Sequence, residues 1–515
     1  MKPTSGMMAG PEPRAGVVVM RFTALVIGLI TMLVLVFPDF TTATIGAATA
    51  WSMQWLGLPV LWLSGLFLLL CLVLLCGPWG KLRLGRVAEG PEFGTLSWIS
   101  MLFAAGMGSG LVFWGVAEPL THAVQPPIPD QSGLDLYRTA LAVTYFHWGL
   151  HAWALYAIAG LVVAWFGYRQ GVPEVPSGAL QTGLAGWLRP SCCRALGAAA
   201  DVLAIAAVVF GVAGALANGT ILLHHGLDEA SGTKLPVGSA YVIILAAMGI
   251  AFLASASSGI QRGIRWLSNG NFLLAMLLLL LVWRQSDVGF TLQLLWLGMV
   301  QYLEILPAWS VQQVEVEGSL AWSADWTITY LLWWIAWTPF VGIFIARISR
   351  GRSVRGYILG VLGVPVLFSM VWFAVMGGGA LVYDAGHGGV LSQAVKADYT
   401  APLFLWFASM GGINGAVLGY LACILLFVFL VTSADSAAYV MGMLSRNGDP
   451  NPPNRNKLLW GSLTVLLAGG LLARQSADVN KTVAIAGAIP YALLLVLQVL
   501  AWSRSFFAAV RSGQK

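Results

Sequence analysis

Two short stretches place small, hydroxyl and acidic residues inside otherwise apolar segments. They are residues 106–110 (GMGSG) and residues 432–435 (TSAD). Alternate glycines weaken a helix by about 1 kcal/mol each relative to alanine, and an unwound membrane segment exposes carbonyl oxygens that bind ions. The hydroxyls of Thr432 and Ser433 would add further oxygen ligands. We therefore expect a sodium site between the two stretches.

Each stretch also has a structural interpretation. Small residues let membrane helices pack closely. Threonine and serine hydroxyls commonly bond to carbonyl groups one turn earlier in their own helix. The sodium site is favoured because the two stretches complement each other, one with backbone carbonyls and the other with side-chain hydroxyls.

Aromatic residues gather well inside two other apolar segments. These residues are Trp148, Trp153 and Tyr156 in one segment and Trp333, Trp334 and Trp337 in the other. On unbroken helices the first three fall within about 140° of arc and the last three within about 100°. Converging aromatic faces hold a quaternary ammonium, each contact contributing ~0.5–2 kcal/mol. For any single tryptophan, membership of an interfacial belt is the alternative.

The charge around these aromatic residues bears on the kind of ligand. Neither aromatic segment carries a buried acid in this region. We therefore expect π faces alone to hold the cation. This favours a zwitterion such as a betaine over a bare cation, which would use a counter-charge.

His147 and His151 lie four residues apart, a spacing that can place two metal ligands on one helix face. The sequence shows no third ligand near them. Structural packing is therefore the favoured interpretation, and no cofactor is expected besides Na⁺ as the coupling ion.

These residues belong to a chain whose composition is that of a membrane protein. Of its 515 residues, 58% are hydrophobic and 9% charged, and the mean hydropathy is +0.80. A soluble protein of this length needs far more charge at its surface. The five cysteines show neither a disulfide framework nor metal-ligand spacing. The composition therefore predicts an all-α integral membrane protein.

A membrane helix needs about 20 mostly apolar residues. This criterion predicts about twelve spans, and the apolar segment 289–310 is expected to be an interfacial helix. The predicted spans cover residues 20–37, 59–77, 97–118, 137–165, 198–222, 239–256, 269–284, 326–348, 356–382, 412–441, 457–474 and 483–503.

The positions of the basic residues predict the orientation. With these spans and an inside N-terminus, 21 of the 27 Lys and Arg residues fall on the inner side. We therefore expect a multi-pass protein of the plasma (bacterial inner) membrane with both termini cytoplasmic. No nucleic-acid partner is expected, because the basic residues are scattered among apolar spans.

One long stretch carries a specific family resemblance. Residues 325–352 read DWTITYLLWWIAWTPFVGIFIARISRGR and closely resemble the signature of the betaine/carnitine/choline transporter (BCCT) family. The glycine stretch followed by Glu118-Pro119, and residues 432–436 (TSADS), also resemble that family. The resemblance covers about residues 15–510.

The resemblance implies an architecture and an assembly. It implies a LeuT-like core of two inverted five-helix repeats (spans 3–7 and 8–12) preceded by two leading helices, alternating access, and a homotrimer. The implied parts are a short cytoplasmic N-terminal tail (1–19), two leading membrane helices (20–96), the first inverted repeat (97–284), an interfacial helix and loop (285–324), the second inverted repeat (325–503) and a short cytoplasmic tail (504–515).

The resemblance also implies site residues. The aromatic box would be Trp148, Trp153, Tyr156 and Trp334, with Trp333 and Trp337 beside it. The substrate would also meet the unwound segment Gly106, Met107, Gly108, Ser109 and Gly110, where Ser109 is an added hydroxyl. The sodium site would use carbonyls of Ala104, Met107 and Phe429 and the hydroxyls of Thr432 and Ser433.

Two departures from the family pattern limit these expectations. Sodium-coupled members often carry two threonines in the fifth span that help to form a second sodium site. The corresponding positions are Val208 and Val212, which offer no side-chain oxygen, so a second sodium at that place is not expected. The tails are short, so osmotic gating by a tail is not expected either.

The leading hypothesis is a sodium-coupled symporter of glycine betaine or a similar trimethylammonium zwitterion. The alternatives are a sodium-independent exchanger of carnitine-type substrates, or a transporter of choline, taurine, ectoine or a sulfonium compound. An enzyme would need titratable groups that converge at one depth, and a channel would need a repeated filter element. The sequence indicates neither.

Overall fold

The computed structural model describes residues 13–85, 89–106, 108–258 and 261–511, and their side chains except those of 13–15, 103–106 and 261–269. The described residues form helices and connecting loops, with no strand among them. The predicted all-α membrane architecture is therefore confirmed. The predicted boundaries between the six parts of the chain stay predictions.

Among the described residues up to position 309 there are eleven α-helices, one 3-10 turn (η1) and one π-helical turn (η2). They are α1 (Pro13–Val36), α2 (Pro38–Cys76), η1 (Pro78–Lys81), α3 (Thr95–Gly106), α4 (Ser109–Val124), α5 (Gly133–Trp148), α6 (Leu150–Ala164), η2 (Trp165–Arg169), α7 (Pro176–Gly183), α8 (Pro190–Ser231), α9 (Val237–Ser258), α10 (Gln261–Gln285) and α11 (Val288–Trp309).

The described residues from position 321 to 511 form eleven further α-helices and three π-helical turns (η3 to η5). They are α12 (Ala321–Ser323), η3 (Ala324–Ile328), α13 (Thr329–Ile348), α14 (Val354–Ile358), η4 (Leu359–Gly363), α15 (Val364–Phe373), η5 (Ala374–Gly378), α16 (Gly379–Gly386), α17 (Val390–Ala397), α18 (Pro402–Ser409), α19 (Gly412–Leu444), α20 (Asn454–Leu472), α21 (Ala477–Ala486) and α22 (Ala488–Arg511).

Within the described part of the chain, ten helical stretches are long and apolar enough to cross a membrane. They include nine of the predicted spans and also α11, the predicted interfacial helix, whose 22 residues reach spanning length. The predicted span 97–118 is divided between α3 and α4, 269–284 matches the shorter apolar helix Gly270–Gln285, and 457–474 lies mostly within the 19-residue helix α20.

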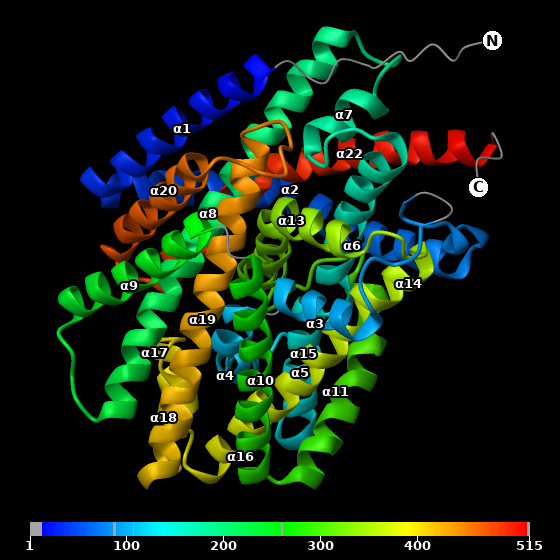
Figure 1. Ribbon diagram of the computed structural model, residues 1–515. Coiled ribbons are helices and arrows are strands. Elements are labelled where there is room, and N and C mark those ends of the chain that lie inside the picture. Colours follow the sequence, from blue (N-terminus) through cyan, green and yellow to red (C-terminus); the bar gives the residue numbers. More distant parts are fainter. Residues whose placement is uncertain (1–12, 86–88, 107, 259–260, 512–515) are drawn as a thin grey trace, which may run out of the picture.

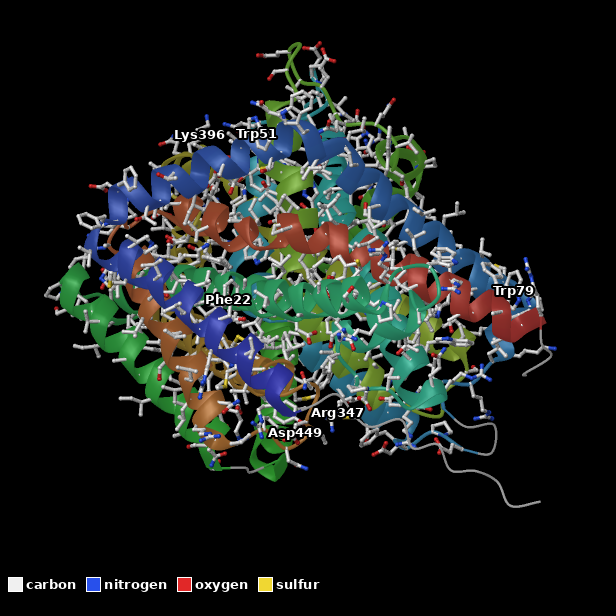
Figure 2. The ribbon with its side chains drawn as sticks, turned by 90° about the horizontal axis from the view of Figure 1, so that it is seen from above. Phe22, Trp51, Trp79, Arg347, Lys396 and Asp449 are labelled. Carbon is white, nitrogen blue, oxygen red and sulfur yellow. The ribbon has the colours of Figure 1, made fainter. Side chains whose placement is uncertain are left out.

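The long helices pack around α6, α8 and α13. Helix α8 packs along α19, α13 packs along α6, and α5 packs along α11. Helices α1 and α20 lie side by side at one edge, and α11 lies at the opposite edge (Figure 1). Outer helices expose apolar side chains, such as Phe22 on α1 and Trp51 on α2 (Figure 2), where Trp51 is 65% exposed. Such a surface suits contact with lipid.

A break at Gly149 divides the predicted span 137–165 into two helices, so Trp148 does not share one unbroken helix with Trp153 and Tyr156. Helix α5 ends at Trp148 and α6 begins at Leu150, because Gly149 has φ −97° and ψ −136°. The Leu150 N–H donates to the Tyr302 hydroxyl of α11 at 3.0 Å. A Cβ atom at Gly149 would collide with the Tyr145 carbonyl oxygen and lie 2.8 Å from the Tyr302 oxygen.

Replacing Gly149 tests whether this break needs glycine. We expect Gly149→Ala to lower the midpoint of thermal unfolding of the detergent-solubilised protein by several degrees, since overpacking costs about 1–3 kcal/mol. Gly28→Ala in α1 is the matched control, because a Cβ atom there meets nothing within 4 Å. Equal midpoints for the two variants would contradict the close packing at Gly149.

Candidate functional site

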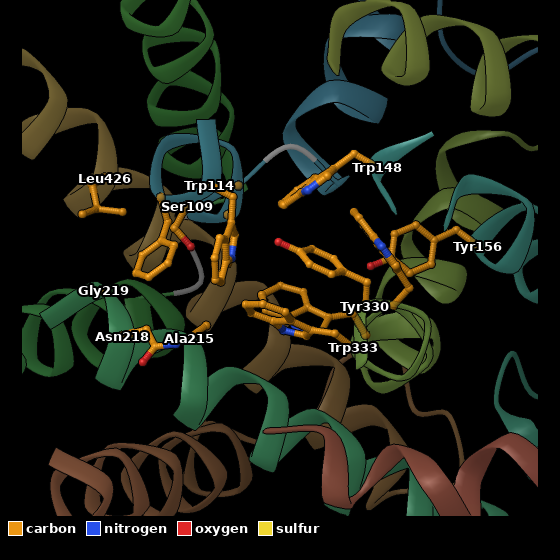
Figure 3. Close-up of a pocket in the computed structure, with 16 residues that line it drawn as sticks. Ser109, Trp114, Trp148, Tyr156, Ala215, Asn218, Gly219, Tyr330, Trp333 and Leu426 are labelled. Carbon is orange, nitrogen blue, oxygen red and sulfur yellow. The ribbon is translucent and has the colours of Figure 1, made fainter. Parts of the chain in front are cut away.

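A cavity lies beside the break between α3 and α4, among α4, α5, α6, α8, α13 and α19 (Figure 3). Its volume is about 80 Å³, several times the space that one water molecule needs. Its lining is mostly aromatic or small. The lining residues are Gly108, Ser109, Gly110, Phe113, Trp114, Trp148, Tyr156, Ala215, Asn218, Gly219, Tyr330, Trp333, Trp334, Trp337, Leu426 and Ser433.

Three aromatic rings enclose one end of the cavity. The Trp334 ring is nearly perpendicular to that of Trp148, with centroids 5.3 Å apart, and lies at 76° to that of Tyr156, with centroids 5.4 Å apart. The Trp334 indole N–H donates to the His147 carbonyl oxygen at 2.9 Å, which fixes the ring. Rings set at such angles can present faces to one cation from several sides.

The structure brings most of the predicted substrate residues together. Those that line the cavity are Gly108, Ser109, Gly110, Trp148, Tyr156, Trp333, Trp334 and Trp337. Trp153 is absent from the described lining and packs behind it, 5.6 Å from the Tyr156 ring and 6.4 Å from the Trp334 ring. Ala104 and Gly106 lie at the end of α3 without described side chains, and Met107 lies outside the described residues.

Glycine at position 110 is required by the approach of α5 to α4. A Cβ atom at Gly110 would lie 2.7 Å from the Trp148 ring. A Cβ atom at Gly108 would lie 3.6 Å from the Ser433 hydroxyl. The glycine stretch therefore admits the Trp148 ring on one side and faces α19 on the other.

The predicted sodium ligands on α19 are arranged unequally. Ser433 lines the cavity beside Gly108. The Thr432 hydroxyl bonds to the carbonyl oxygens of Val428, at 2.8 Å, and Phe429, at 3.1 Å, of its own helix. Asp435 accepts a hydrogen bond from Ser255 of α9 at 2.6 Å, which places that carboxylate outside the cavity. The sodium site stays a prediction.

The structure corrects the expectation that no acid accompanies the aromatic residues. Glu118 lies on α4, between the two aromatic segments in space, and is fully buried. One of its carboxylate oxygens (Oε2) accepts from the Trp148 indole N–H at 2.7 Å and from the Tyr330 hydroxyl at 2.5 Å. The carboxylate is absent from the described lining, so rings still form the contact surface, but a negative charge lies directly behind two of them. The sequence carried a signal in Glu118-Pro119, downstream of the glycines.

The histidines make separate contacts rather than one two-histidine site. The Nδ1 atom of His147 lies 2.7 Å from Oε1 of Glu118, and its Nε2 atom lies 3.1 Å from the Thr327 hydroxyl. His151 instead bonds to the Ser310 hydroxyl at 2.9 Å. His147 also belongs to a group of three possible metal ligands: the ligand atoms of Glu118, His122 and His147 lie within 4.8 Å of one another. Helical spacing did not reveal this set because His147 comes from another helix.

Other cavity residues carry no chemical pattern of their own in the sequence, although Tyr330 lies within the family-like stretch 325–352. Tyr330 and Trp114 form walls whose ring centroids are 5.9 Å apart. Asn218 of α8 accepts from the Asn480 side chain of α21 at 2.9 Å, which joins α21 to the cavity wall. These positions could only be recognised after the helices had been placed in space.

A multi-span helical bundle with a broken helix beside an aromatic cavity is the architecture of a membrane transporter. The sequence matches the profile of the family described as BCCT, betaine/carnitine/choline family transporter, over residues 18–510, and the chain belongs to this family. It is therefore a transporter and not an enzyme.

Three relatives carry informative names. The chain is 36% identical over 484 residues to the glycine betaine transporter OpuD of Bacillus subtilis, covering 93% of this chain and 92% of the relative. It is 34% identical over 440 residues to the ectoine/hydroxyectoine transporter of Virgibacillus pantothenticus, covering 85% and 86%. It is 31% identical over 493 residues to the high-affinity choline transport protein of Escherichia coli, covering 93% and 70%.

Removing the charge of Glu118 tests its role in organising the cavity. The glutamine side chain of Glu118→Gln has one acceptor oxygen, whereas both oxygens of the carboxylate accept hydrogen bonds. Because hydrogen bonds to a buried charged group contribute about 1.5–3 kcal/mol, we expect a lower thermal-unfolding midpoint and a changed tryptophan emission spectrum. Glu304→Gln, at an exposed position on α11, is the control. Wild-type behaviour of Glu118→Gln would show that these hydrogen bonds do not organise the cavity.

Proposed function

We propose that this protein is a sodium-coupled symporter of glycine betaine or a similar trimethylammonium zwitterion, working by alternating access. The observation that carries the proposal is the enclosure of one end of the cavity by Trp148, Tyr156 and Trp334 beside a broken helix. The related transporters named for glycine betaine, ectoine and choline support this class of substrate.

The aromatic rings supply the substrate interaction in this proposal. A quaternary ammonium has no N–H to donate, so it gains little from carbonyl oxygens and much from ring faces. Each face contributes ~0.5–2 kcal/mol. The ring of Trp148 is further oriented by its bond to Glu118, which places a carboxylate close behind the proposed ammonium position.

Sodium coupling rests on the meeting of α19 with the break between α3 and α4. Ser433 lies next to Gly108. The carbonyls of Ala104, Met107 and Phe429 and the Thr432 hydroxyl complete the proposed ligand set. Val208 and Val212 of α8 are buried and aliphatic, so the proposal includes one sodium ion. It also includes a homotrimer in the bacterial inner membrane with both termini cytoplasmic.

One observation favours a second candidate, a sodium-independent exchanger of carnitine-type substrates. The Thr432 hydroxyl already bonds to carbonyl oxygens of its own helix. If it stays there throughout transport, it does not act as a sodium ligand. Exchange of external for internal substrate without sodium would favour this candidate.

Uptake by two threonine variants in proteoliposomes distinguishes the symporter from the exchanger. We expect glycine betaine uptake to rise several-fold with an inward sodium gradient and Thr432→Ala to abolish most of that rise, because an oxygen ligand is lost. Thr464→Ala on α20 is the matched control, since it removes the same kind of bond to the carbonyl four residues earlier. Equal sodium dependence of both variants and wild type, or uptake indifferent to sodium, would contradict the coupling proposal.

A further inference from the structure

Lys481 places a buried positive charge behind one wall of the cavity. This residue of α21 is 9% exposed. Its ammonium nitrogen lies 4.6 Å from the centre of the Trp326 ring and 5.6 Å from that of the Trp114 ring. Trp114 lines the cavity. Asn480, which precedes Lys481 in α21, donates a hydrogen bond to the cavity residue Asn218. The start of α21 therefore contacts the cavity wall at this point.

The ammonium of Lys481 lacks a close protein counter-ion. Among the described residues no carboxylate oxygen lies within 4.0 Å of it, and no side-chain hydrogen bond joins it to another residue. The acids whose charges act on it are Asp325, Asp478 and Glu118. Asp478 and Asp325 are exposed, and the Glu118 carboxylate is already bonded to Trp148, Tyr330 and His147. Two ring faces stabilise the ammonium only in part.

The buried charges lie behind different walls of the cavity. Glu118 is bonded to Trp148 and Tyr330, whereas Lys481 lies against Trp114. In Figure 3, Trp114 and Ser109 lie on the side of the cavity opposite Trp148 and Tyr156. Negative charge thus lies behind Trp148 and Tyr330, and positive charge lies behind Trp114, whose ring adjoins that of Tyr330 with centroids 5.9 Å apart.

Hydrogen-bond donors are also available at the Trp114 end. The buried indole N–H of Trp114 has no acceptor within the described structure. The Ser109 hydroxyl lines the same end (Figure 3), together with the Asn218 side chain, whose amide nitrogen already donates to the Ala477 carbonyl oxygen at 3.5 Å. A buried donor without an acceptor is costly. An anionic group at this end would therefore gain hydrogen bonds as well as a favourable field.

We propose that Lys481 makes the cavity selective for zwitterions over bare cations. The trimethylammonium group lies among Trp148, Tyr156 and Trp334, and the anionic group points towards the Trp114 end and the Lys481 charge. This inference rests on the proposed function and names the substrate class of the same cavity. Choline carries no anionic group, so it meets the repulsion of Lys481 without the compensating attraction.

The size of the effect follows from Coulomb's law. Two unit charges about 10 Å apart at an effective dielectric constant of about 20 change an equilibrium constant about tenfold. Removing the Lys481 charge is therefore expected to weaken glycine betaine binding and to strengthen choline binding. The two dissociation constants shift in opposite directions, so both shifts reduce the preference for glycine betaine over choline.

The test measures equilibrium binding of radiolabelled glycine betaine and choline to purified protein. We expect wild type to prefer glycine betaine, and Lys481→Met to reduce that preference about tenfold or more. Lys481→Arg retains the charge and should keep the preference within about threefold of wild type. Lys396→Met removes an exposed lysine of α17 and is the control for net charge. Lys481→Gln serves as a polar neutral variant if the methionine variant does not fold.

The outcomes separate this inference from the proposed function. Wild type that binds choline as tightly as glycine betaine overturns the inference, and so does a folded neutral variant that binds glycine betaine with the wild-type preference. In both cases the proposal of quaternary ammonium transport survives. Wild type that binds neither compound contradicts the proposed function, and the inference fails with it.

Discussion

The cavity depends on the buried carboxylate of Glu118. A charge in a membrane interior is tolerated only when hydrogen bonds satisfy it, and Trp148, Tyr330 and His147 supply them. These partners come from α5 and α13. The hydrogen bonds to one carboxylate on α4 therefore fix the relative positions of three helices. Two of the three partners, Trp148 and Tyr330, also line the cavity. The same hydrogen bonds therefore shape the site and hold the bundle together.

Glycine makes this convergence sterically possible. Side chains at Gly110 and Gly149 would collide with the Trp148 ring and with the α5–α11 contact, respectively. The two helix breaks occur at Gly108 and at Gly149, where backbone groups leave the regular helical pattern. The transporter thus gains a site of rings and unwound backbone without exposing polar backbone to lipid.

The sequence predicted the features that depend on local pattern, and missed those that depend on distant partners. Composition and span length predicted the all-helical membrane fold, the alternate glycines lie beside the break between α3 and α4, and residues 325–352 indicated the family. The break at Gly149 depends on Tyr302, and the partners of Glu118 lie 29 to 212 positions away. In the sequence, Lys481 is distinguished only as one of the few basic residues that the predicted orientation places on the outer side. No periodicity within one helix could have placed it against Trp114.

The central claim is that ring faces in this cavity recognise a quaternary ammonium. The most direct measurement is displacement of radiolabelled glycine betaine by the tert-butylacetate anion, which has the same shape with a neutral carbon in place of the charged nitrogen. Because three ring faces contribute ~0.5–2 kcal/mol each, the account predicts displacement at least about tenfold weaker than by unlabelled glycine betaine. Equal displacement by the two compounds would contradict it.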